Sequence, residues 1–235
     1  MPGRFERSKR GDRAPEGIPE WFQLLKFAVD VLEKTGINRD MWTWGGGSAL
    51  AYRFRHRRSR DIDIFLKDVQ LLPALSPRVN PHLEGVDFAE MANWLKLKLG
   101  EMELDFIVAP NLTGLAPSLE EVHGLTVYVE HPVEIMTKKL FYRSESLKAR
   151  DLVDLAVVLR ECPPGEIDLL LDVVESRADV LTDRIRFLLQ DEGLRQEIGA
   201  MEAALSPEAV VEAARGFLDL ITLPPAVEKP LHRGG

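Results

Sequence analysis

The sequence has a single cysteine, Cys162, among its 235 residues. One cysteine cannot form an internal disulfide, and it cannot supply a zinc site built from several thiolates. No apolar run reaches the ~18 to 20 residues needed to cross a bilayer. The first 17 residues also lack the apolar segment of a secretory signal. We therefore expect a cytoplasmic protein with no membrane association.

An excess of basic charge is missing as well. The formal net charge is −8, and residues 161–235 carry all of it, with 15 acidic and 7 basic side chains. Residues 1–160 carry 23 of each and are balanced. This distribution argues against non-specific nucleic-acid binding but leaves room for a local basic patch.

Apolar periodicity divides the chain into a mixed part and a helical part. Residues 1–17 form a polar leader that we expect to be disordered. Helical spacing predicts helices over 18–35, 49–54, 133–143 and 147–159, with three or four more over 166–222. Residues 67–83 are expected to hold a short helix and a proline-containing loop. Strand patterns occupy 41–44, 61–66, 86–91, 94–99, 102–108 and 126–130. We expect an α+β (mixed α/β) domain over 18–131, followed by a helical domain over 132–235.

A glycine-rich turn, Gly46-Gly47-Ser48, joins the strand over 41–44 to a short helix. Glycines allow the backbone to approach a bulky anion, and the following helix offers free N–H groups and a positive dipole end. Ser48 adds a hydroxyl donor. The turn therefore indicates a phosphate site, although Ser48 alone is equally typical of a helix N-cap.

Carboxylates follow this turn in an order that suits metal chemistry. Asp61 and Asp63 lie two residues apart on one strand, so their side chains share a face. Two adjacent carboxylates repel each other unless a cation separates them, and hard oxygen ligands favour Mg²⁺. Asp105 lies on a later strand and projects opposite Leu104 and Phe106. A phosphate cradle beside such acids is suited to metal-assisted nucleotidyl transfer, whereas each acid alone is typical of solvated surface.

Two segments resemble the AbiEii/AbiGii nucleotidyltransferase toxins, a branch of the DNA polymerase β-like superfamily. The first runs from Gly46-Gly47-Ser48-Ala49-Leu50 through Arg58-Ser59-Arg60-Asp61-Ile62-Asp63. The second joins Lys138-Lys139-Leu140 to Ala149-Arg150-Asp151-Leu152-Val153-Asp154. The resemblance covers roughly residues 40–160 and implies a polymerase-β-like core with a mixed sheet.

The resemblance also implies a role for each motif residue. Gly46, Gly47 and Ser48 hold the nucleoside triphosphate (NTP). The metal ligands of a two-ion Mg²⁺ site are Asp61, Asp63 and Asp105, and Asp105 is also the general base. Lys139, Asp151 and Asp154 complete the pocket: Lys139 and Asp151 serve catalysis, and Lys139 and Asp154 contact the nucleotide. The alternative is that Lys139 is a surface residue and both acids form ordinary surface ion pairs.

A basic cluster precedes the acid pair. Its five arginines, Arg53, Arg55, Arg57, Arg58 and Arg60, fall within eight residues that contain no acid. Like charges this dense are unfavourable without an anionic partner, so we expect Arg55, Arg57 and Arg58 to hold an acceptor backbone. The alternative is a solvated face, and His56 is interpreted as a bystander.

We therefore predict a Mg²⁺-dependent enzyme that transfers a nucleoside monophosphate from an NTP to a hydroxyl. By resemblance, the NTP is GTP or CTP, the acceptor is tRNA, and an antitoxin protein is the partner. Two alternatives remain open. One is nucleotidyl transfer to a small molecule such as an antibiotic, and the other is a nucleotide-binding module without catalysis.

Overall fold

The computed structural model describes residues 19–222, so the predicted leader over 1–17 lies outside the described residues. The strands are β1 (Trp42–Gly45), β2 (Ile62–Leu66), β3 (Asp87–Met91), β4 (Trp94–Leu99), β5 (Met102–Val108), β6 (Ser118–Val122) and β7 (Leu125–Val129). The helices are α1 (Glu20–Lys34), α2 (Gly46–Phe54), α3 (Leu72–Leu75), α4 (Pro132–Tyr142), α5 (Ala149–Glu161), α6 (Pro164–Val174), α7 (Ala178–Gln190), α8 (Leu194–Ala200) and α9 (Pro207–Thr222).

The strands form one mixed sheet in the order β3-β4-β5-β2-β1-β7-β6. Strand β2 lies at its centre, antiparallel to β1 and parallel to β5. This pairing places Asp63 opposite both Gly45 and Asp105. The register therefore brings the glycine turn and two of the predicted acids to the same place.

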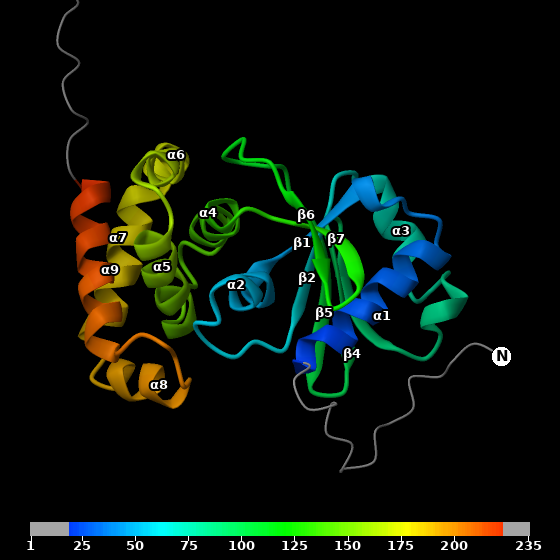
Figure 1. Ribbon diagram of the computed structural model, residues 1–235, viewed down its shortest axis with the longest axis horizontal. Helices are drawn as coiled ribbons and strands as arrows, with labels where there is room; N and C mark the ends of the chain where they lie inside the picture. The colour runs from blue at the N-terminus through cyan, green and yellow to red at the C-terminus, as the bar shows by residue number, and fades with distance from the viewer. Residues whose placement is uncertain (1–18, 223–235) are drawn as a thin grey trace, which may run out of the picture.

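The two faces of the sheet differ in character because side chains alternate along each strand. One face presents fully buried apolar side chains, among them Ile62, Ile64, Leu97, Leu104 and Phe106. Helix α1 packs on this face across β2 and β5. The other face carries Asp63 and Asp105, and α2 and α4 lie on that side (Figure 1).

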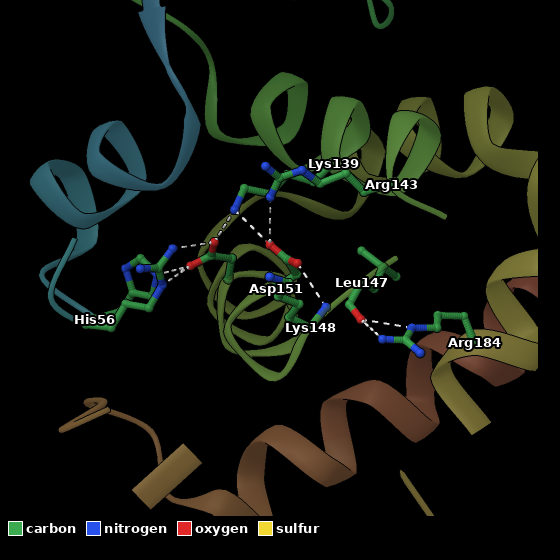
Figure 2. Close-up of polar contacts among 9 residues, drawn as sticks. His56, Lys139, Arg143, Leu147, Lys148, Asp151 and Arg184 are labelled. Carbon is green, nitrogen blue, oxygen red and sulfur yellow. Dashed lines mark hydrogen bonds and ion pairs between the residues drawn. The ribbon is translucent and has the colours of Figure 1, made fainter. Parts of the chain in front are cut away.

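The C-terminal helices pack against α4 and α5 on the side away from α1 (Figure 1). Helix α5 contacts α9, and α4 contacts α6. One backbone hydrogen bond ties this helical part to the segment after α2, because Ala204 N donates to His56 O at 2.7 Å. Within the helical part, the Arg184 guanidinium donates to Leu147 O in the connection between α4 and α5 (Figure 2). No helix within residues 19–222 has the length and apolar character of a membrane span.

The observed elements agree with the predicted ones except at β6. The predicted strands and helices are present with ends shifted by a few residues, and four helices follow residue 163. Strand β6 was not predicted, because Ser118–Val122 is mostly polar and exposed at the sheet edge. The predicted domain division after residue 131 falls between β7 and α4.

Candidate active site

A cavity of about 710 Å³ lies between the polar face of the sheet, helix α4 and the start of α2. Acidic side chains line it on the sheet side, and basic side chains line it mainly on the helical side. The acids are Asp61, Asp63, Glu103 and Asp105; the bases are Arg57, Lys96, Lys138, Lys139, Arg143, Lys148 and Arg150. The three predicted metal ligands therefore open into one space with seven cations.

The predicted acids lie on two neighbouring strands. Asp63 on β2 is directly opposite Asp105 on β5. Asp61 immediately precedes β2, and its Oδ1 accepts a hydrogen bond from Glu103 N at 3.0 Å. This bond fixes the Asp61 carboxylate and leaves its Oδ2 without a protein partner among the described hydrogen bonds. The structure thus brings together the three acids that the sequence selected.

Burial and mutual repulsion make ionisation of Asp63 and Asp105 unfavourable. Burial raises the pKa of Asp63, and the charge of Asp61 adds to this, while Lys139 and Arg143 lower it. Burial, followed by the charge of Asp63, raises the pKa of Asp105 to about 6. One oxygen of Asp105, Oδ1, is buried without a hydrogen-bond partner. These are the conditions under which a cation stabilises a group of carboxylates.

Lys96 is a cavity residue that the sequence analysis did not select. Strand β4 places it opposite Asp105, and its Nζ lies 2.9 Å from Asp105 Oδ2 and 2.5 Å from Glu103 Oε2. The ammonium group therefore neutralises part of the acid cluster. The alternation of Trp94, Lys96 and Lys98 on the strand adjacent to Asp105 was the signal that could have identified it.

The lack of side chains at Gly46 and Gly47 leaves room for neighbouring polar groups to approach the backbone of the turn. Gly46 has a φ of +68°, and a Cβ there would overlap the Asp63 carboxylate. A Cβ on Gly47 would lie 2.6 Å from Arg57 Nη2. Helix α2 begins at Gly46 with no side chain bound to its first N–H groups. The turn therefore leaves a helix N-terminus open to the cavity, the arrangement that binds phosphate.

Ser48 does not line this cavity. Its side chain is fully buried, and its Oγ accepts a hydrogen bond from Trp44 Nε1 at 3.1 Å. The predicted contact between the Ser48 hydroxyl and the nucleotide is not supported by this placement. The alternative N-cap role is not observed either, because Gly45 is the N-cap and no side chain caps the helix. Ser48 instead anchors the turn to the core.

Lys139 extends from α4 toward the start of α5, where Asp151 and Asp154 lie (Figure 2). Its Nζ is 3.1 Å from Asp151 Oδ1 and 2.5 Å from Asp154 Oδ2. Asp151 also accepts from Lys148 N at 3.0 Å, which caps α5. Lys139 lines the cavity and the two acids do not. The acids therefore act by positioning Lys139, and the predicted direct contact of Asp154 with the nucleotide is not supported.

Asp154 is the centre of a buried polar network. Its carboxylate receives Arg57 through Nε at 2.7 Å and Nη2 at 2.9 Å, and His56 through Nε2 at 2.6 Å. Burial opposes its ionisation, but the charge of Lys139 and the bonds from His56 and Arg57 hold the pKa of Asp154 well below its usual range. His56 is therefore not a bystander, and the surface ion-pair alternative is wrong for Asp154, which is fully buried.

The arginine cluster does not act as one anion-binding surface. Intramolecular carboxylates neutralise most of it: Arg53 pairs with Glu120, Arg57 with Asp154, Arg58 with Glu202, and Arg60 with Glu20 and Glu101. Arg57 is the member that lines the cavity, whereas Arg55 and Arg58 are exposed outside it. Successive side chains leave the chain in different directions, so the four paired arginines meet different carboxylates. Acceptor binding by Arg55, Arg57 and Arg58 stays a prediction.

The free oxygens of the acid cluster suit a magnesium ion. No three His, Cys, Asp or Glu side chains within the described chain form a group that could hold a metal by itself. Mg²⁺ usually takes one or two carboxylates and completes its shell with water and substrate phosphates. Asp61 Oδ2, the Asp63 carboxylate and the unpartnered Asp105 Oδ1 are the available oxygens, so the residues fit such an ion together with a phosphate ligand.

Comparison with protein families gives one assignment. Residues 31–221 match the family described as "Nucleotidyl transferase AbiEii toxin, Type IV TA system". No curated protein sequence matches the chain.

Solved structures give the fold. The chain is similar to MenT4, the nucleotidyltransferase toxin Rv2826c from Mycobacterium tuberculosis H37Rv, with a TM-score of 0.57, 19% identity and coverage of 89% of this chain and 87% of that one. It also matches JHP933 from Helicobacter pylori, with a TM-score of 0.49, 17% identity and coverage of 86% and 90%. The first similarity supports the predicted polymerase-β-like architecture.

Proposed function

Because the chain belongs to the AbiEii family of nucleotidyltransferase toxins, we propose that it transfers a nucleoside monophosphate from an NTP to a hydroxyl of an RNA acceptor. The observation that carries this proposal is the single cavity in which Asp61, Asp63 and Asp105 face Lys139 and an open helix N-terminus. Acids for a metal and donors for a polyphosphate are the two requirements of this chemistry.

The triphosphate binds between the start of α2 and helix α4. Backbone N–H groups at Gly46 and Gly47 and the side chains of Arg57, Lys139 and Arg143 surround this space. Arg57 and Lys139 are held in place by Asp154, so they need little ordering when the ligand arrives. Preorganised cations of this kind stabilise the charge that develops on the phosphates during transfer.

Magnesium is the ion that these residues fit. Asp61, Asp63 and the free oxygen of Asp105 would hold the ions of a two-metal site, and Lys96 neutralises the remaining Asp105 oxygen. When bound, such ions polarise the phosphate and stabilise the attacking and leaving oxygens.

In the proposed reaction, an acceptor hydroxyl oxygen forms a bond to the α-phosphorus. The bond between the α-phosphorus and the oxygen that bridges to the β-phosphate breaks, and pyrophosphate leaves. Asp105 accepts the hydroxyl proton as general base. Without a bound ion the pKa of Asp105 is about 6, and a cation at its free oxygen would lower it, so the carboxylate is ionised and able to accept a proton near neutral pH.

Cations at the mouth of the cavity support an RNA acceptor. Lys148 and Arg150 line the cavity, and no carboxylate within the described chain forms an ion pair with either side chain. Unpaired cations beside a catalytic site are suited to backbone phosphates. Arg55 and Arg58 lie outside the cavity and are secondary candidates for the same backbone.

The family description as a type IV toxin supports a role in a toxin–antitoxin system. We propose that the acceptor is tRNA, that GTP or CTP is the donor, and that an antitoxin protein counteracts the toxin. Small-molecule transfer remains the enzymatic alternative and requires no contact with Lys148 or Arg150.

A labelling experiment tests the proposal. The protein is incubated with Mg²⁺, total tRNA and each of the four NTPs in turn, labelled at the α-phosphate. Incorporation from one or two NTPs into tRNA supports the proposal, with an Asp61→Asn variant as the inactive control. Labelling of none of the RNAs, while a small hydroxylated acceptor is labelled, would refute the RNA acceptor.

A further inference from the structure

The cavity has a charged half and an apolar half, and the division follows the strand register. Asp63, Asp105 and Lys96 form one row across β2, β5 and β4. Phe65, Ile107 and Trp94 form the next row on the same face. The rows are two residues apart along each strand, which is about 7 Å.

Helix α4 forms the opposite wall of the cavity and also contributes both charged and apolar side chains to it. Lys139 and Arg143 are four residues apart and line the cavity beside the acids. Ile135 and Tyr142 are seven residues apart, lie beside Lys139 on the same face of the helix, and line the same cavity. Lys138 lines the cavity on their other side, and its ammonium group is paired with Glu130. Tyr142 is 53% exposed although it is a large aromatic side chain. Both walls therefore change from charged to apolar within one cavity.

The aromatic side chains in the apolar half have surface to offer a ligand. Trp94 is partly exposed, and no aromatic or cation–π contact to its ring is found within residues 19–222. Phe65 differs, because Lys138 Nζ already lies 4.1 Å from its ring centroid. The Tyr142 ring makes one edge contact, with the Phe141 ring at 5.2 Å between centroids, and is still 53% exposed. Trp94 and Tyr142 are thus the rings with surface left for stacking.

We propose that this apolar half, formed by Phe65, Trp94, Ile107, Ile135 and Tyr142, is the slot that binds a nucleobase. The inference rests on the proposed function and adds to it the site of the base. A phosphate or pyrophosphate alone needs only the charged half. A nucleotide has an anionic end and a flat apolar end joined by a ribose, which matches the two adjacent rows.

The base belongs either to the incoming NTP or to the acceptor nucleotide beside the reacting hydroxyl. Inorganic tripolyphosphate separates the base from the phosphates, because it carries the same charge pattern without a base. We propose calorimetric titration of three proteins: wild type, Trp94→Ala and Tyr142→Ala. Their dissociation constants for tripolyphosphate report on the charged half of the cavity, and the additional effect on NTP reports on the apolar half. Phe187→Ala, at a 62% exposed position outside the cavity, is the matched control.

If the slot holds the NTP base, Trp94→Ala and Tyr142→Ala each weaken NTP binding by about tenfold and leave tripolyphosphate binding unchanged. If it holds the acceptor base, the NTP dissociation constant is unchanged and the acceptor KM rises by about tenfold. Either result supports the slot. Unchanged constants for both substrates would overturn it, as would equal losses for NTP and tripolyphosphate.

Tryptophan fluorescence gives an independent readout. Trp21, Trp42 and Trp44 are buried, so Trp94 is the tryptophan placed to report on the cavity. The slot predicts quenching of wild-type fluorescence by the base-bearing ligand, no quenching by tripolyphosphate, and loss of the signal in Trp94→Phe while binding is retained. Wild-type protein that binds no NTP would refute the proposed function itself, whereas an unchanged NTP dissociation constant together with an unchanged acceptor KM in both variants refutes only the slot.

Discussion

Lys139 Nζ lies 2.5 Å from Asp154 Oδ2, and the lysine reaches the cavity while the carboxylate is fully buried behind it. The same carboxylate holds Arg57 and His56. One buried acid therefore positions two cavity cations on different elements, α4 and the segment after α2.

Replacing Asp154 with Asn should destabilise the protein by about 3 kcal/mol, because it leaves buried cations without their counter-charge. Urea unfolding measures this loss, and Asp168→Asn, an exposed acid on α6, is the matched control. The network has no such role if the two variants unfold at the same urea concentration.

The raised pKa of Asp105 makes stability depend on pH. The folded-state pKa of about 6 exceeds the ordinary value of about 4. The folded protein therefore binds the proton more tightly than the unfolded chain does. Its stability falls as the pH rises from about 4 to above 6, by up to about 3 kcal/mol from this group.

Asp105→Asn removes this dependence. We expect its free energy of unfolding, relative to wild type, to increase between pH 4 and pH 7 when both are measured without divalent ions. Parallel stability curves for the two proteins would show that Asp105 is not held near pKa 6.

Gly47→Ala tests the close approach at the start of α2. The added Cβ lies 2.6 Å from Arg57 Nη2, whose side chain is only 8% exposed and bonded to Asp154. We expect NTP binding to weaken by about 1 to 2 kcal/mol as the guanidinium is displaced. The control is Gly216→Ala in α9, where an added Cβ meets no atom within 4 Å. We expect this change to leave NTP binding unaltered and to raise the free energy of unfolding by at most about 1 kcal/mol. Equal NTP affinity in both variants would contradict the assigned position of the triphosphate.

If Lys148 and Arg150 bind the RNA backbone, the KM for RNA depends on salt concentration. Lys148→Ala with Arg150→Ala should raise the KM for RNA and flatten its salt dependence by about 0.7 per lost phosphate contact. Arg55→Ala with Arg58→Ala removes the same charge outside the cavity and should have a smaller effect. The opposite ranking would restore the arginine cluster as the acceptor site.

Local patterns were sufficient for most of the fold. The apolar alternation in β2, β4 and β5 and the helical periodicity after residue 132 identify elements whose burial follows from their own sequence. Strand β6 was not predicted because Ser118–Val122 is mostly polar and exposed at the sheet edge, so it has no alternating apolar pattern.

The candidate site was predictable where it depends on strand register and not where it depends on tertiary contacts. Alternation along one strand put Asp61 and Asp63 on one face, and the family resemblance selected Asp105, which the pairing of β2 with β5 brings opposite Asp63. The partners of Asp154, and Ser48 as a partner of Trp44, depend on how helices meet the sheet. His56 and Asp154 are 98 positions apart, so no local spacing encodes their contact. Trp44 and Ser48 are only four positions apart, and their contact depends on the turn from β1 into α2.

The central claim is that the α-phosphate of an NTP is transferred by chemistry that depends on Asp63. The direct measurement is the fate of label from α-labelled and γ-labelled NTP, for wild type and Asp63→Asn, with tRNA and Mg²⁺. We predict that wild type incorporates the α-label, releases pyrophosphate that carries the γ-label, and that Asp63→Asn reduces incorporation by about 10³-fold or more. Transfer of the γ-label to the acceptor, or near-normal incorporation by a folded Asp63→Asn variant, would contradict the account.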